Sequence, residues 1–389
     1  MIPRLALRNL LGAGLKTWLN VIVLSFSFVI IIWMQGLYKG MGDQVRVAQT
    51  DAEFGGGQYW QENYDPFDPL SLQDAHATIP EALQTVINKG QATPILISQA
   101  TIYPEGRMQT ILMKGIDPAQ NVVNLPTRFL DQTDKDLPAL IGTRMAKNAG
   151  LKIGDSITIR WRDAKGTFDA RDAEIVQIMK TSVPTVDQAQ IWVPLDKMQA
   201  LTRMENEASL VILSQDIREF PQASGWVHKD MDFLLKDINM MVQSKQIGGS
   251  FVYTILLALA MLAIFNTQVL SIFRRRKEMG TLMSMGMTRG KLIRLFTLEG
   301  AMHSVLAALV AALYGIPFLL WQAKAGWAMP EGMDDFGMAL GEALYPIYGA
   351  GLVIGTTLLI LLVTTIVSFL PTRKIAKLKP TDALRGKMT

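Results

Sequence analysis

The side chains best able to take part in chemistry are charged groups, and they are concentrated in residues 274–294. This segment reads RRRKEMGTLMSMGMTRGKLIR. Seven of these residues are Lys or Arg, one is Glu278 and four are Met. Guanidinium and ammonium groups bind carboxylates and phosphates, and methionine provides adaptable apolar contact. The chemistry predicted for this segment is therefore non-covalent recognition of a partner.

Residue types and motifs that carry catalysis are sparse in this chain of 389 residues. It has no cysteine, which excludes disulfides, Fe–S clusters and thiol catalysis, and its three histidines (His76, His228 and His303) are far apart in sequence. The nearest approach to a phosphate-binding G-x-x-x-x-G-K-[ST] loop is GAGLKT at residues 12–17, which has the wrong spacing. We therefore expect no catalytic residues, no metal site, no directly bound cofactor and no ATPase motif in this chain.

Four apolar runs indicate a membrane protein: residues 18–38, 249–273, 301–321 and 346–370. None of them contains Asp, Glu, Lys or Arg. Each is close to the roughly 20 residues that cross a hydrocarbon core of about 30 Å as a helix. The first run is too long for the apolar part of a signal peptide and has no A-x-A-like cleavage site after it, so we expect an uncleaved helix.

The distribution of basic residues predicts the orientation of these helices. Outside residues 39–245 there are 17 Lys or Arg, and 16 of them lie before the first run, in residues 274–294 or after residue 371. Because basic residues favour cytoplasmic loops, residues 274–294, an N-terminal helix at 1–17 and a tail at 371–389 are predicted to be cytoplasmic. Residues 39–245 and a short loop at 322–345 are then external.

The large external segment carries 21 Lys or Arg and 27 Asp or Glu, so the basic charge of the chain belongs to its membrane portion. That charge suits membrane orientation and anionic headgroups, and we expect no nucleic-acid binding. Alternating patterns and turn residues predict an α+β domain. Strands are expected at residues 94–100, 108–115, 139–141, 156–161, 174–179, 190–193 and 209–213, and helices at 81–89, 143–150 and 194–204. Apolar stripes in residues 37–45 and 231–242 predict helical stalks at its two ends.

Four strings show a family resemblance when they are taken together. They are ALRNL at residues 6–10, IGT…LKIGD at 141–155, the segment 274–300 with its Arg275, Arg276, Glu278, Gly280, Gly286, Glu299 and Gly300, and PTRK…LKPTDALR after residue 370. In order and spacing the chain resembles the FtsX/MacB-type ABC transporter permeases, the family that includes lipoprotein-releasing permeases. Met279 replaces a family Ile, and Ser284 replaces a family Ala.

The resemblance implies a membrane α-helical fold with four transmembrane helices and a large α+β extracytoplasmic domain between helices 1 and 2. Such permeases act in pairs, with the same chain or a paralogue, on a separate ABC ATPase dimer that binds ATP and Mg²⁺. ATP-driven closure of the helices is passed to the external domain, which pushes the substrate, a mechanism called mechanotransmission. The implied location is the bacterial inner membrane, with the large domain in the periplasm.

The resemblance also implies roles for particular residues. A coupling helix at residues 276–286 would sit in a groove of the ATPase, with contacts from Arg276, Lys277, Glu278, Met279, Gly280, Met283, Met285, Gly286 and Met287. An amphipathic helix lying on lipid headgroups is the alternative. The external ends of the first two helices would offer an apolar substrate cavity lined by Phe28, Ile32, Met34, Phe251, Ile255 and Leu256, although lipid contact or helix packing would use the same residues.

Glu299 lies at the cytoplasmic entry of the third apolar run, where a carboxylate is costly unless it is paired. Its expected partner is Arg294 or the cluster at residues 274–277, in a structural ion pair. A role in proton coupling is the alternative.

Three functions remain open at this stage. A lipoprotein-releasing permease fits four helices, an external domain of about this size and the absence of a fused ATPase, and it would pass its cargo to a periplasmic carrier. A MacB-like efflux permease for peptides or drugs and an FtsX-like regulator of a cell-wall hydrolase are the alternatives.

Overall fold

The computed structural model describes residues 6, 14–132, 135–328 and 343–373, and the chain divides into two units. Of the described residues, the helical unit contains 6, 14–41, 241–328 and 343–373, and the sheet unit contains 42–132 and 135–240. Most of the predicted N-terminal helix (1–17), short loop (322–345) and tail (371–389) lies outside the described residues.

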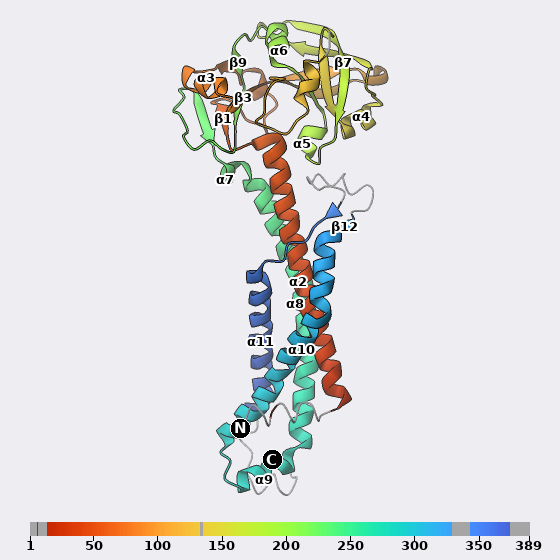
Figure 1. Ribbon diagram of the computed structural model, residues 1–389, viewed down its shortest axis with the longest axis vertical. Helices are drawn as coiled ribbons and strands as arrows, with labels where there is room; N and C mark the ends of the chain where they lie inside the picture. The colour runs from red at the N-terminus through yellow and green to blue at the C-terminus, as the bar shows by residue number, and fades with distance from the viewer. Residues whose placement is uncertain (1–5, 7–13, 133–134, 329–342, 374–389) are drawn as a thin grey trace. The chain divides into compact units, whose positions relative to one another are not determined.

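Among the described residues, four helices are long and apolar enough to cross a membrane: α2 (Leu15–Gln49), α8 (Lys236–Arg274), α10 (Arg289–Ala325) and α11 (Ala350–Thr372) (Figure 1). Three of them contain a predicted apolar run completely and α11 contains all but the first four residues of the fourth run, which confirms four transmembrane helices. The predicted helical stripes are also helical, because α2 continues to Gln49 and α7 (Met231–Leu234) precedes α8. Polar first and last turns of α8 and α10 extend the helices beyond the apolar runs.

The core of the helical unit is formed by aliphatic side chains from these four helices. Leu24, Phe28 and Ile264 are each at most 2% exposed. Polar pairs add to this packing, since Asn20 donates to Thr267 Oγ1 at 2.8 Å and Ser25 lies 3.3 Å from the Tyr314 hydroxyl. Such pairs matter in lipid because helix association there has no hydrophobic drive.

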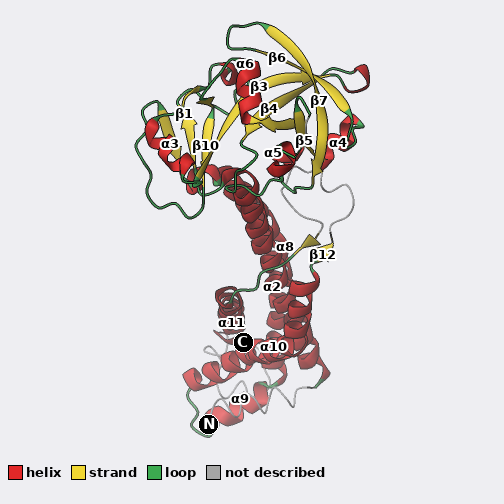
Figure 2. Ribbon diagram, turned by 45° about the horizontal axis from the view of Figure 1, so that its top comes forward, coloured by secondary structure: helices red, strands yellow, loops and turns green. Residues whose placement is uncertain are grey.

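The sheet unit contains a nine-stranded sheet in the order β11-β1-β10-β3-β4-β8-β5-β7-β6 (Figure 2). The strands are β1 (Gln58–Gln61), β3 (Ala92–Ile102), β4 (Gln109–Ile116), β5 (Pro138–Gly142), β6 (Ser156–Arg162), β7 (Phe168–Met179), β8 (Gln190–Pro194), β10 (Leu210–Leu213) and β11 (Trp226–Lys229). Because β3 also pairs with β6, the six strands from β3 to β6 close into a barrel, which leaves no free edge there.

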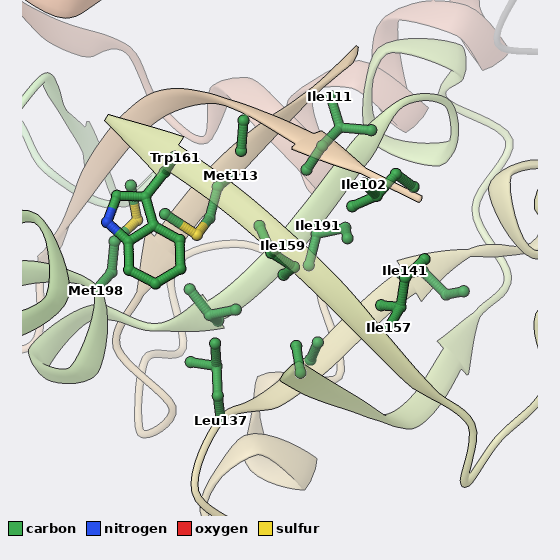
Figure 3. Packing of buried hydrophobic residues seen from close by; sticks show 14 of the residues in the cluster. Ile102, Ile111, Met113, Leu137, Ile141, Ile157, Ile159, Trp161, Ile191 and Met198 are labelled. Atoms are coloured by element: carbon green, nitrogen blue, oxygen red, sulfur yellow. The ribbon is translucent and has the colours of Figure 1, made fainter. Parts of the chain in front are cut away.

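The barrel is filled by side chains that alternate inward along its strands (Figure 3). On β6 the inward residues are Ile157, Ile159 and Trp161, each at most 4% exposed, and the residues between them are exposed. The Trp161 indole N–H donates to the Leu201 carbonyl at 3.2 Å, so its one polar atom is satisfied. A second cluster, around Tyr59, Leu83 and Val211, packs α3 (Glu81–Asn88) against the open part of the sheet.

The IGT string at residues 141–143 has a structural explanation. The buried Asp187, on α5 (Pro184–Asp187), accepts a hydrogen bond from the Arg144 N–H in the first turn of α4 (Thr143–Ala149). A Cβ added at Gly142 would lie 2.2 Å from the Asp187 carboxylate. Only glycine therefore leaves room for the side chain that caps α4.

The end of α2 is joined to the sheet through polar contacts. A π-turn (Thr50–Phe54) follows α2, the Asn124 N–H donates to the Asp51 carbonyl at 2.7 Å, and Thr185 donates to Glu53 Oε2 at 2.6 Å. Lys114 on β4 points to the sheet face opposite the barrel core, is 6% exposed and lies 4.9 Å from the Trp192 ring centroid. Burial lowers the pKa of Lys114, and the charge of Glu53 opposes this shift.

The α+β class predicted for this segment is confirmed, and β3 to β8 and β10 coincide with the predicted strands. The helices predicted at 81–89, 143–150 and 194–204 are present as α3, α4 and α6 (Leu195–Thr202). Sequence reasoning missed β1 and β11, which pair with each other. Both have only four residues and carry bulky polar or aromatic side chains without clear alternation.

We predict that Lys114→Met stabilises the sheet unit by about 1 to 4 kcal/mol, because a buried charge without close ionic contact is replaced by an apolar chain of similar length. Wild-type stability should rise with pH from the lowered folded pKa of Lys114 up to the ordinary value of 10.5, since the unfolded chain binds more protons there. The variant should lose this rise. Thermal unfolding followed by tryptophan fluorescence measures both effects, with exposed Lys89→Met as the control. A lower melting temperature in Lys114→Met would contradict the prediction.

Candidate functional site

The charged segment predicted to bind a partner forms a helix–turn–helix at one end of the helical unit. α8 ends at Arg274, α9 (Arg276–Ser284) follows, and α10 begins at Arg289. Gly286 ends α9 with a φ of +93°, a conformation that other residues rarely adopt, and its N–H donates to the Met283 carbonyl. The Thr288 hydroxyl caps α10 by accepting from the Lys291 N–H.

α9 is held in place by an apolar cluster beneath it. Ile272, Met279, Leu292 and Phe296 are each at most 6% exposed and come from α8, α9 and α10. Met283 and Met287 are partly buried against the same cluster. Met279 and Gly280 therefore face the interior of their own chain, and of the four methionines only Met285, at 71% exposed, is fully presented outward.

Arg275 joins the α8–α9 junction to α10 through two carboxylates. Its Nη1 lies 3.0 Å from both carboxylate oxygens of Glu299, and its Nε donates to Glu278 Oε2 at 2.8 Å. The guanidinium also lies over the Phe296 ring, 5.1 Å from its centroid. Burial alone would lower the pKa of Arg275, but the hydrogen bond to Glu278 and the charge of Glu299 outweigh it and raise that pKa.

The expectation of a paired Glu299 is confirmed, and the partner comes from the cluster at residues 274–277 rather than from Arg294. Glu299 is 5% exposed, so its carboxylate depends on this contact. Burying a charge is costly unless it is paired and hydrogen-bonded, and the contact of Arg275 Nη1 with both carboxylate oxygens provides both.

The outer face of the segment is basic. Lys277, Arg289, Lys291 and Arg294 are exposed. Arg276 is half-buried, with its guanidinium 4.4 Å from the Phe273 ring centroid. Glu278 is exposed but already neutralised by Arg275. A partner that binds this face must therefore present acidic groups and an apolar contact for Met285.

The six residues predicted for a substrate cavity are not gathered in one place in the single chain. Phe28 and Ile32 are at most 7% exposed and pack inside the bundle, and Met34 and Leu256 are half-buried. Phe251 and Ile255 lie on an outer face of α8 at 68% and 60% exposed. Helical periodicity in a fully apolar run does not distinguish these faces, so the sequence carried no signal that separates them.

The sheet unit has a separate concave region of about 380 Å³, lined partly by strands β3, β4 and β6. Leu70, Met108 and Phe168 around it are 85%, 74% and 61% exposed. Arg160 and Arg162 are the charged residues among its described lining, which contains no Asp or Glu. This region combines exposed apolar side chains with polar ones and two arginines, in a segment that has an excess of acidic residues.

Among the described residues, no side-chain cluster of three or more His, Cys, Asp or Glu could bind a metal ion. The arrangement is that of a multi-pass membrane protein with a separate folded external domain and a recognition segment between its second and third spanning helices.

Comparison with known families assigns this class more closely. The MacB-like periplasmic core domain matches residues 17–225, more than half of the chain, and the FtsX-like permease C-terminal domain matches residues 250–380. The chain therefore belongs to the FtsX/MacB family of ABC transporter permeases, whose members are membrane subunits and not themselves ATPases.

Individual relatives are distant. The chain is 20% identical over 322 residues to the lipoprotein-releasing system transmembrane protein LolC of Xylella fastidiosa, covering 76% of this chain and 77% of that protein. It is 24% identical over 280 residues to the uncharacterized ABC transporter permease YknZ of Bacillus subtilis, covering 65% and 64%. The crystal structure of the extracellular domain of a YknZ from Gram-positive bacteria aligns over 41% of this chain and 83% of that one, with 15% identity and a TM-score of 0.24.

We predict that Arg275→Gln destabilises the permease more than the double variant Arg275→Leu/Glu299→Leu does. Arg275→Gln removes the guanidinium that pairs with the buried Glu299 carboxylate and should cost about 3 to 5 kcal/mol, whereas the double variant Arg275→Leu/Glu299→Leu should recover most of this loss. Thermal unfolding of the solubilised permease gives these differences. Glu278→Gln is the control, because its exposed contact should contribute at most about 1 kcal/mol.

A further variant, Glu299→Gln, tests whether the pair is structural or takes part in proton coupling. A structural pair predicts that Glu299→Gln lowers stability and leaves the pH optimum of transport where it is in the wild type. A shifted optimum would show that the carboxylate exchanges protons during turnover.

Proposed function

We propose that this permease works with a separate ATPase to release lipoproteins from the bacterial inner membrane, with its sheet unit in the periplasm. The observation that supports this most is the similarity to the lipoprotein-releasing protein LolC. It covers 76% of the chain, more than either unit alone, so it includes parts of both the sheet and the helices. The family itself implies the ATPase partner.

In this proposal α9 is the coupling helix, and the ATPase provides the site for ATP and Mg²⁺. The contact is made by exposed groups: Lys277, Arg289 and the apolar Met285. Met279, Gly280, Met283 and Met287 act indirectly, because they pack α9 onto α8 and α10. The Arg275–Glu299 pair then makes a force on α9 act on α10 as well.

A second copy of the permease, or a paralogue, completes the transmembrane pair. The external ends of α2 and α8, with the six apolar residues predicted for the substrate cavity, would meet acyl chains only in that assembly. Movement of the helices would reach the substrate through the sheet unit, as mechanotransmission requires.

The concave region lined by Arg160, Arg162 and Met108 is the proposed contact for the cargo or its periplasmic carrier. Its apolar surface suits an apolar segment, and its two guanidinium groups suit carboxylates on the partner. The net acidic charge of residues 39–245 suits either a basic patch on a carrier or a surface that only keeps the domain soluble. The local charge here has the opposite sign, so an acidic partner surface is the better match.

Efflux of a peptide or drug is the second candidate. The MacB-like profile over residues 17–225 and the similarity to YknZ support it. The two functions differ in what leaves the membrane, so a transport assay distinguishes them directly.

We predict that Met285→Asp and Met108→Asp separate ATP coupling from cargo release. Met285→Asp places a carboxylate on the basic apolar face of α9 and should abolish ATPase co-purification, with little change in melting temperature because Met285 is 71% exposed. Met108→Asp should leave the ATPase bound and its activity intact, but should reduce lipoprotein release from proteoliposomes at least tenfold, about 1.4 kcal/mol of lost interaction.

Each variant is the control for the other, since both replace an exposed methionine by the same acid. Normal assembly of Met285→Asp would exclude α9 as the docking helix. Wild-type complexes that hydrolyse ATP but release no lipoprotein, with or without an acceptor, would move the efflux function ahead.

A further inference from the structure

Three buried polar side chains in the helical unit have an atom without a partner. Gln268 on α8, His303 on α10 and Ser368 on α11 are 2%, 3% and 0% exposed. Gln268 Oε1, His303 Nε2 and Ser368 Oγ donate to or accept from none of the residues that the structure describes. An unsatisfied polar atom is costly in any protein interior, and more so in a lipid-embedded one where no bulk water can replace the missing bond.

These side chains approach one another across three helices. A Cβ added at Gly300 would lie 2.3 Å from Ser368 Oγ and 2.8 Å from Gln268 Nε2, so both side chains reach the same point on α10. His303 is three residues further along α10, which places it on the same face one turn away. Glycine at position 300 is what allows α8 and α11 to come this close.

The hydroxyl of Ser368 is unusual among the buried hydroxyls of these helices. Ser304 donates to the Ala301 carbonyl at 2.6 Å, and Thr364 donates to the Ile360 carbonyl at 2.7 Å, each within its own helix. This local bond is the common solution for Ser and Thr in a helix. Ser368 does not make it, so its hydroxyl remains available for a partner beyond α11.

The contact of His303 with its own helix determines what its free nitrogen can do. Nδ1 lies 3.1 Å from the Glu299 carbonyl oxygen, which can only accept, so Nδ1 carries the proton. In the neutral ring Nε2 is then an acceptor, and it lies on the side of the ring away from Nδ1. The free atoms are therefore two acceptors, Gln268 Oε1 and His303 Nε2, and one hydroxyl.

We propose that Gln268, His303 and Ser368 bind a water molecule that joins α8, α10 and α11 inside the membrane. The water donates one hydrogen bond to Gln268 Oε1 and one to His303 Nε2, and it accepts a hydrogen bond from the Ser368 hydroxyl. Three hydrogen bonds are the usual number for a buried water, and each of the three unsatisfied atoms gains one. The site lies on α10 about one turn from Glu299, so it is close to the Arg275–Glu299 pair and adds α11 to the helices joined there.

The sign of one substitution tests this proposal. If the Ser368 hydroxyl has no hydrogen-bond partner at all, Ser368→Ala removes the free-energy cost of burying it. The melting temperature of the solubilised permease then rises. If Ser368 binds water, Ser368→Ala lowers it by several degrees. Ser304→Ala is the matched control, because that buried hydroxyl is satisfied within its own helix.

A double-variant cycle and a direct measurement complete the test. Gln268→Leu added to Ser368→Ala should lower the melting temperature little further, because the water is lost with the first change; additive losses would contradict a shared ligand. Millisecond X-ray hydroxyl-radical labelling of the wild type should oxidise His303 although it is 3% exposed, since the radical forms from the bound water. Absence of labelling at His303 in the wild type would overturn the proposal even if the variants fail to fold.

Discussion

The buried pair of Arg275 and Glu299 is the contact on which the recognition segment depends. Within this segment α8 ends, α9 packs against the bundle and α10 begins. Arg275 lies directly after α8 and contacts Glu278 on α9 and Glu299 on α10. The Glu299 carboxylate is only 5% exposed, so water stabilises its charge little and the pair with Arg275 is favoured. The pair therefore keeps Arg275 next to α10. The position of α9 relative to α10 is therefore set by charge, and the Met279 cluster adds the apolar surface that keeps water away from it.

The sheet unit shows the same use of polar atoms at a point where an element must be held. Asp187 caps α4 and requires glycine at position 142, and Glu53 receives Thr185 where α2 ends. Lys114 is buried on the face that receives this end of α2, although an apolar residue would fit a strand better. Buried polar groups of this kind contribute little to stability and instead select one arrangement of the elements.

Much of the architecture could be predicted from the sequence because it follows from composition over short ranges. The apolar runs and basic flanks determine four helices, and alternation identifies most strands. The string at residues 141–155 resembles a barrel-like part of the family's external domain, but the pairing that closes the barrel, between Ala100 and Trp161, could not be predicted because these residues are far apart along the chain. The polar site at Gln268, His303 and Ser368 was missed for the same reason, although three polar residues inside long apolar runs were a usable signal.

The methionines of α9 show where sequence reasoning about a site reaches its limit. Met279, Met283 and Met287 recur at the four-residue spacing of one helix face and Met285 does not, but the spacing alone does not say which face meets the chain and which meets a partner. In the structure Met279 points inward and Met285 points outward. Two of the arginines also contact their own chain, because Arg275 pairs with Glu299 and Arg276 lies over the Phe273 ring. The exposed basic residues of the segment are Arg274, Lys277 and those at the start of α10, and these remain for recognition. The run of arginines therefore contains residues with two different roles, and the residues that resemble the family signature, such as Arg275 and Glu299, build the site rather than meet a partner.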